Sequence, residues 1–281
     1  MGFQAVKDLL VGVLMGAVSF LPGASGSTIA VIFRVYERLV ADVADIKNKL
    51  LKDLKFIIPI GVGVLLGMLV CARGLEFLLN DYEIPMMFLF VGLIVTQIPD
   101  IKSMGDDGQK MTVLNAVAFI AGVAVMMAFM VIGWNAPIDN ENPGFIIMVL
   151  VGVIYAMSLL SPGISGSTVL LALGFFTAFD TAISHPFHNL DLILPIALGL
   201  LVGALAFAKV IDYFMRNHRK STYSAILGLT VGSALAVLIN ALRDLSGDEM
   251  IIQSVICLII GAILGLGLNR LAHMYSEKKE E

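Results

Sequence analysis

Long stretches of hydrophobic residues, separated by short polar segments, dominate the chain. Segments without Asp, Glu, Lys or Arg cover 9–33, 56–72, 84–99, 111–138, 142–179, 192–208, 221–242 and 250–269. Several of them approach the roughly 20 residues that an α-helix needs to cross a bilayer. The pattern therefore predicts an all-α polytopic membrane protein in which residues 1–281 form a single integral membrane domain.

Two of these segments contain a Pro-Gly pair, Pro22-Gly23 in 9–33 and Pro162-Gly163 in 142–179. Proline removes a backbone donor and clashes with the preceding helical turn, so each segment should form two half-helices, a broken or re-entrant hairpin. The remaining segments predict six full transmembrane crossings. These are expected at about 56–79, 85–99, 112–134, 192–215, 222–242 and 250–270.

The charged residues orient these crossings. Only 14% of the chain is charged, against about 25% in soluble proteins. With the crossings above, all but two of the 18 Lys and Arg residues, Arg73 and Arg243, fall on one face. The positive-inside rule makes that face cytoplasmic and places both termini there, in the cytoplasmic membrane. The net charge of −4 and the two cysteines exclude a nucleic-acid-binding protein and a disulfide-rich scaffold.

An internal repeat is the most informative feature of the sequence. Leu-Pro-Gly-Ala-Ser-Gly-Ser-Thr at 21–28 recurs as Ser-Pro-Gly-Ile-Ser-Gly-Ser-Thr at 161–168, and flanking glycines such as Gly12 and Gly152 keep the offset of 140. Each half, about 1–138 and about 139–281, then holds one broken or re-entrant hairpin and three crossings. Three is odd, so the second half enters the membrane inverted. Inverted-topology repeats are typical of transporters, whereas a duplication retained only for packing is the alternative.

The repeated motif has the features of an anion-binding site. Ser25 and Ser165 are suited to cap the second half-helices, which leaves backbone amides and hydroxyls directed into each break. A paired kink, in which the hydroxyls only satisfy freed carbonyls, is the alternative. The candidate substrate-binding residues in the two motifs are Gly23, Ser25, Gly26, Ser27, Thr28, Gly163, Ser165, Gly166, Ser167 and Thr168.

Several charged residues flank the predicted breaks. Arg34, about two turns beyond the first motif, is a candidate phosphate ligand. The pairs Arg73/Glu76 and Lys209/Asp212 are spaced i,i+3, so each pair can neutralise itself, and both are candidates for gating or coupling. We expect no metal or cofactor. Coupling to protons or sodium is left open, with Glu76 and Asp212 as its candidate acids.

Two histidines, His185 and His188, fall in a predicted outer loop and are interpreted as solvated residues rather than metal ligands.

The paired Pro-Gly-x-Ser-Gly-Ser-Thr motifs and the pattern of crossings resemble the prokaryotic PopT-type polyprenyl-phosphate transporter family, formerly domain of unknown function 368. The resemblance implies transport of polyprenyl phosphate across the cytoplasmic membrane, with undecaprenyl phosphate as the expected substrate. This transport recycles the lipid carrier for cell-envelope synthesis. The residue x differs, Ala24 against Ile164, so the two sites differ in volume. The alternatives are an intramembrane polyprenyl-pyrophosphate phosphatase and a small-anion channel; neither motif contains the acidic or arginine side chains that hydrolysis requires.

Overall fold

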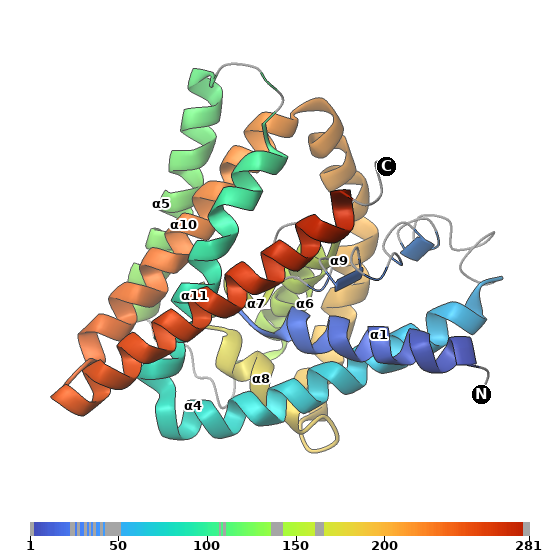
Figure 1. Ribbon diagram of the computed structural model, residues 1–281, viewed down its shortest axis with the longest axis horizontal. Helices are drawn as coiled ribbons and strands as arrows, with labels where there is room; N and C mark the ends of the chain where they lie inside the picture. The colour runs from blue at the N-terminus through green and yellow to red at the C-terminus, as the bar shows by residue number, and fades with distance from the viewer. Residues whose placement is uncertain are drawn as a thin grey trace.

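The computed structural model describes residues 3–22, 26, 29–30, 33, 35, 38–39, 42, 52–106, 108, 111–135, 143–160 and 166–277, where all regular structure is helical (Figure 1). The helices are α1 (Phe3–Phe20), α4 (Leu54–Met104), α5 (Val113–Asn135), α6 (Phe145–Leu160), α7 (Gly166–Ala172), α8 (Phe176–Ser184), α9 (Leu190–Asn217), α10 (Arg219–Asp244) and α11 (Asp248–Glu277).

The prediction of an all-helical protein is therefore confirmed over the described residues. Helices α5, α9, α10 and α11 cover almost all of the crossings predicted at 112–134, 192–215, 222–242 and 250–270. Helix α6 ends at Leu160 and α7 begins at Gly166, and the Pro162-Gly163 pair, where a break is predicted, lies between them and outside the described residues.

Helix α4 contains both of the crossings predicted between residues 56 and 99. Its 51 residues are bent at Tyr82, which has non-helical angles, φ −137° and ψ 40°. Pro85 explains the position of the bend, since its ring clashes with the carbonyl four residues earlier and its nitrogen donates no helical hydrogen bond. Figure 1 shows the two parts of α4 running in different directions.

Three helices are long and apolar enough to span a membrane, at Leu54–Met104, Arg219–Asp244 and Asp248–Arg270, and shorter apolar helices accompany them. Large hydrophobic side chains lie exposed along these helices, among them Leu65 and Val70 on α4 and Ile263 on α11. Extended apolar surface of this kind is unfavourable in water and favourable in lipid. The chain is thus a multi-pass helical membrane protein.

Glycines at repeat-related positions allow close helix contacts that match each other. Helix α1 packs along α4, and a Cβ on Gly12 would collide with the carbonyl oxygen of Ile60. Helix α6 packs along α9, and a Cβ on Gly152 would collide with the carbonyl oxygen of Ile196. The second contact is the repeat equivalent of the first, because Gly152 corresponds to Gly12 and Ile196 corresponds to Ile60 in the second half.

A second pair of contacts joins the two halves of the chain. A Cβ on Gly92, in the second part of α4, would collide with the carbonyl oxygen of Leu258 in α11. A Cβ on Gly228, in α10, would collide with the carbonyl oxygen of Phe119 in α5. The last helix of the first half, α5, therefore packs against α10. The last helix of the second half, α11, packs against the second part of α4.

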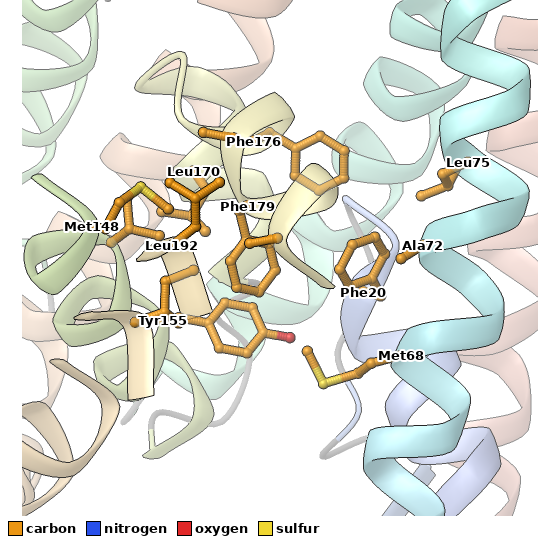
Figure 2. Packing of buried hydrophobic residues seen from close by; sticks show 14 of the residues in the cluster. Phe20, Met68, Ala72, Leu75, Met148, Tyr155, Leu170, Phe176, Phe179 and Leu192 are labelled. Atoms are coloured by element: carbon orange, nitrogen blue, oxygen red, sulfur yellow. The ribbon is translucent and has the colours of Figure 1, made fainter. Parts of the chain in front are cut away.

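The main hydrophobic core lies between α1, α4, α6, α7, α8 and α9. Figure 2 shows residues of this core, with Phe179 of α8 between Tyr155 of α6 and Phe20 at the end of α1. Phe20 and Phe179 are almost completely buried. Because α1 and α8 belong to different halves, burial of these rings holds the two halves together.

Candidate functional site

The structure describes only part of the predicted substrate site. Four of the predicted substrate-binding residues lie in the described part of the chain: Gly26, Gly166, Ser167 and Thr168. The other predicted ligands lie outside the described residues, namely Gly23, Ser25, Ser27, Thr28, Arg34, Gly163 and Ser165. Lys209 and Asp212 lie in α9, but the structure describes only their backbone and not their side chains.

The carbonyl oxygen of Ser19 connects the two motif regions. The hydroxyl of Ser167 donates a hydrogen bond to it at 3.2 Å, and the hydroxyl of Tyr155 donates a second at 3.3 Å. Ser19 lies in the last turn of α1, where carbonyls have no partner within the helix, and nearby Pro22 has no N–H to offer. The second motif thus supplies a partner that the break in the first half leaves missing.

The first motif contacts the same turn of α1. A Cβ on Gly26 would collide with the Ser19 hydroxyl and would lie 2.7 Å from the carbonyl oxygen of Met15. The chain after the first break therefore folds back onto α1. Gly26 from one copy of the motif and Ser167 from the other both approach Ser19 closely.

The hydroxyl-bearing residues at the start of α7 are buried. Ser167 is completely buried and Thr168 is 5% exposed. Buried hydroxyls require hydrogen-bond partners, and the Ser19 carbonyl provides one for Ser167. In this conformation that serine therefore also has the structural role that the sequence analysis kept as the alternative to anion binding.

A layer of aromatic rings lies at the end of α1, where Phe20 packs beside α8 (Figure 2). The ring centroid of Phe20 lies 5.7 Å from that of Phe176 and 5.5 Å from that of Phe179. The centroid of Phe179 lies 4.7 Å from that of Tyr155. These distances are typical of favourable aromatic pairs, so α8 is fixed against both the end of α1 and the side chain that bonds to Ser19.

The predicted gating pair on α4 contacts α8 and the residue that follows it. Arg73 donates a hydrogen bond from Nε to the carbonyl oxygen of Ser184 at 3.2 Å, and Glu76 Oε2 lies 3.5 Å from Nδ1 of His185. The sequence analysis noted that Arg73 and Glu76 can neutralise each other and interpreted His185 as a solvated residue. In the structure Arg73 and Glu76 also contact Ser184 and His185, because α8 lies against this part of α4. The side chain of His185 is 45% exposed, and its contact with Glu76 is one that the sequence analysis did not anticipate.

Asp180, which the sequence analysis did not select, is buried beside this pair. It is 3% exposed, and its Oδ1 has no hydrogen-bond partner. Burial, and secondarily the nearby Glu76 carboxylate, raises the pKa of Asp180 to about 7. A sequence signal existed, since Asp180 is the sole charged residue of the helix Phe176–Ser184. The sequence analysis did not use it because Asp180 directly follows the uncharged segment 142–179.

Within the described part of the chain, no three His, Cys, Asp or Glu side chains gather in a way that could hold a metal ion. The chemistry visible in the described site is that of hydroxyls, backbone groups and a few charged side chains. Such groups bind and orient an anion.

Comparison with known proteins identifies the family. A family profile described as undecaprenyl phosphate translocase-like matches residues 15–247. A polyprenyl-phosphate transporter of Staphylococcus aureus is 30% identical over 94% of this chain and 96% of its own length. A polyprenyl-phosphate transporter of Vibrio cholerae is 27% identical over 81% of this chain and 76% of its own. No solved structure matches the chain.

The matched region contains both motifs, the Ser19 contact and the whole of α8. The two relatives are named as transporters rather than as enzymes, which agrees with the absence of acidic and arginine side chains from the motifs themselves. The chain belongs to the undecaprenyl phosphate translocase-like family.

Proposed function

We propose that this protein transports polyprenyl phosphate, with undecaprenyl phosphate as its substrate, across the cytoplasmic membrane of a prokaryote. The family match and the names of both relatives support this function. The observation within the structure that carries it is the shared contact at Ser19, where residues from both motif copies meet. A single headgroup site between two inverted halves needs such a meeting point.

The two halves, about 1–138 and about 139–281, form an inverted-topology repeat in this proposal. The matched contacts of Gly12 and Gly152, and of Gly92 and Gly228, support it because a two-fold axis relating the halves would generate each contact from its partner. Both termini lie on the cytoplasmic side, as the distribution of Lys and Arg requires.

The phosphate headgroup binds between residues 23–28 and 163–168. Its ligands are the backbone amides and hydroxyls of the two motifs, and Arg34 approaches from the cytoplasmic side. The prenyl chain remains in the lipid. Alternating access follows when the two halves rock about this site and expose the headgroup to one side and then to the other.

The charged pairs act as gates at opposite ends of the protein. Arg73 and Glu76 lie toward the outer end of the first part of α4, and Lys209 and Asp212 lie toward the inner end of α9. The contacts of Arg73 with Ser184 and of Glu76 with His185 support a closed outer gate in this conformation.

The test is transport of a fluorescent polyprenyl phosphate in proteoliposomes containing the purified protein. We expect Ser25→Ala combined with Ser165→Ala to lose most of the activity, because each change removes a helix cap and a headgroup donor. Ser233→Ala is the control, since Ser233 is a buried serine whose hydroxyl bonds within α10.

Normal transport by the double variant at wild-type expression would exclude the motifs from the mechanism. Release of inorganic phosphate from undecaprenyl pyrophosphate by the purified protein would favour the phosphatase instead. Ion conductance without lipid substrate would favour the channel.

A further inference from the structure

Helix α8 buries an acidic side chain that the transport mechanism above does not use. Asp180 is 3% exposed, and its Oδ1 has no hydrogen-bond partner. One turn later, the hydroxyl of Ser184 is also buried without a partner. An ionised carboxylate in such a place loses its hydration without gaining a compensating bond, whereas the protonated acid is neutral.

The charged neighbours of Asp180 are more exposed than Asp180 itself. The side chain of Glu76, whose charge acts on Asp180, is 31% exposed, and that of His185, which Glu76 contacts, is 45% exposed. Water therefore reaches the groups next to the buried acid.

The other groups around Asp180 include few charges that would hold it ionised. Arg73 is the nearest cation on α4, but its Nε donates to the carbonyl of Ser184. Helix α7 carries no titratable side chain, and the acid and base of α1 lie in its first turns. The titratable and charged groups facing α8 are Cys71, Arg73 and Glu76 of α4, Tyr155 of α6, His185 and His188 beyond its C-terminus, and Asp191 of α9.

The position of α8 depends on the same contacts that join the two motifs. A turn at Gly174, with φ +78°, links α8 directly to α7, which carries Ser167. Phe179, adjacent to Asp180, packs against Phe20 and against Tyr155, whose hydroxyl bonds to Ser19 (Figure 2). Displacement of α8 from α4 therefore disturbs the meeting point of the two motifs.

The first half of the chain contains another buried acid in a different setting. Asp42 is 5% exposed and its Oδ2 has no hydrogen-bond partner, but it lies near Arg38 and Asp53. Among the described residues, no such cation lowers the pKa of Asp180.

We propose that Asp180 is a proton-binding residue whose protonation holds α8 against α4 and closes the outer side of the transporter. A proton from external water binds the carboxylate of Asp180 and forms the carboxylic acid. When α8 leaves α4, the acid becomes hydrated and returns the proton to water. The assignment of this end to the outside rests on the orientation in the proposed function.

The pH dependence has a defined sign. The pKa of Asp180 is raised in the closed state by burial and by Glu76, and returns toward the ordinary value when the acid is hydrated. The preference for the closed state is therefore at its maximum below about pH 4. Between about pH 4 and about pH 7 the ratio of closed to open protein falls by up to about tenfold per pH unit.

The experiment measures accessibility of the α8 interface in intact cells. Ser184→Cys is introduced into the full chain with Cys71→Ala and Cys257→Ala, and is labelled by a membrane-impermeant maleimide at external pH values from about 5 to about 8. Labelling of His188→Cys, at an exposed position four residues later, corrects for the pH dependence of the thiol reaction itself. We expect corrected labelling of Cys at position 184 to rise with pH and to become independent of pH when Asp180→Asn is added.

Two further variants test the mechanism. Glu76→Gln removes the neighbouring like charge and should shift the transition to lower pH. Asp191→Asn, a change at an exposed acid on α9, should leave the transition unchanged.

A pH dependence that persists in Asp180→Asn, or its absence in the parent protein, would overturn the proposal. Because the assay needs no substrate, absence of transport by the parent protein would count against the proposed function and leave the labelling result to decide the proton site.

Discussion

Removal of both hydroxyl donors to Ser19 should cost more than the two single changes together. Tyr155→Phe keeps the ring that packs on Phe179 and removes only the hydroxyl, and Ser167→Ala removes the other donor. After either single change the Ser19 carbonyl keeps one partner. After both changes the Ser19 carbonyl, at a helix end, has lost both of the side-chain donors that the structure describes.

The magnitude follows from the geometry. The two bonds are long, 3.3 and 3.2 Å, so each single change should cost about 0.5–1 kcal/mol in free energy of unfolding. An unsatisfied buried carbonyl costs about 1–3 kcal/mol in addition to the lost bonds, so the double variant should show a clear coupling energy.

The assay is chemical unfolding of the purified variants in mixed micelles, analysed as a double-mutant cycle. Ser233→Ala provides the control, because the Ser233 hydroxyl donates at 2.8 Å to the Thr230 carbonyl within α10, where the helix supplies another donor. Additive costs of the two single changes would refute the reasoning, since they would mean that the Ser19 carbonyl is not a shared acceptor.

Two more predictions concern helix contacts. Gly63→Ala should lower the free energy of unfolding by about 1–3 kcal/mol, because the added Cβ would collide with the Leu9 carbonyl oxygen. Gly61 lies on the same helix with open space around it, so Gly61→Ala should be neutral or stabilising by up to about 1 kcal/mol. Equal effects on thermal unfolding would contradict the α1–α4 packing. Asn269→Ala should lower the free energy of unfolding by about 1 kcal/mol, because Nδ2 of Asn269 donates a hydrogen bond to the Thr96 carbonyl at 2.7 Å. An unchanged melting temperature would show that this bond contributes nothing to the α4–α11 contact.

Local rules explain why the helix positions were predictable. A run of apolar residues of sufficient length must form a helix in lipid, because the bilayer offers no other partner for backbone groups. The end of α1 just before Pro22 has an equally local reason, the loss of a donor and a steric clash, and the same reason predicts a break at Pro162. Pro85 marks the bend in α4 for the same reason, although the sequence analysis expected two separate helices there.

The partners of the functional residues were not predictable in the same way. Arg73 and Glu76 were selected as a pair because i,i+3 spacing is visible in the sequence, yet they contact Ser184 and His185, more than a hundred positions away. Asp180 was overlooked because its burial depends on α8 packing against α4 and on the rings of Phe20 and Tyr155.

The sequence by itself determined that this is a helical membrane protein, where its helices break, and that a Ser-Gly-Ser-Thr motif follows each break. These properties depend on residues close together in the chain, through hydrophobicity, proline chemistry and repetition. Only the tertiary structure decided that residues from both motifs meet at the Ser19 carbonyl and that Asp180 is buried beside Glu76. Those contacts arise because helices from the two halves must cover one another's apolar and small-residue faces, and that packing sets distances that sequence spacing does not contain.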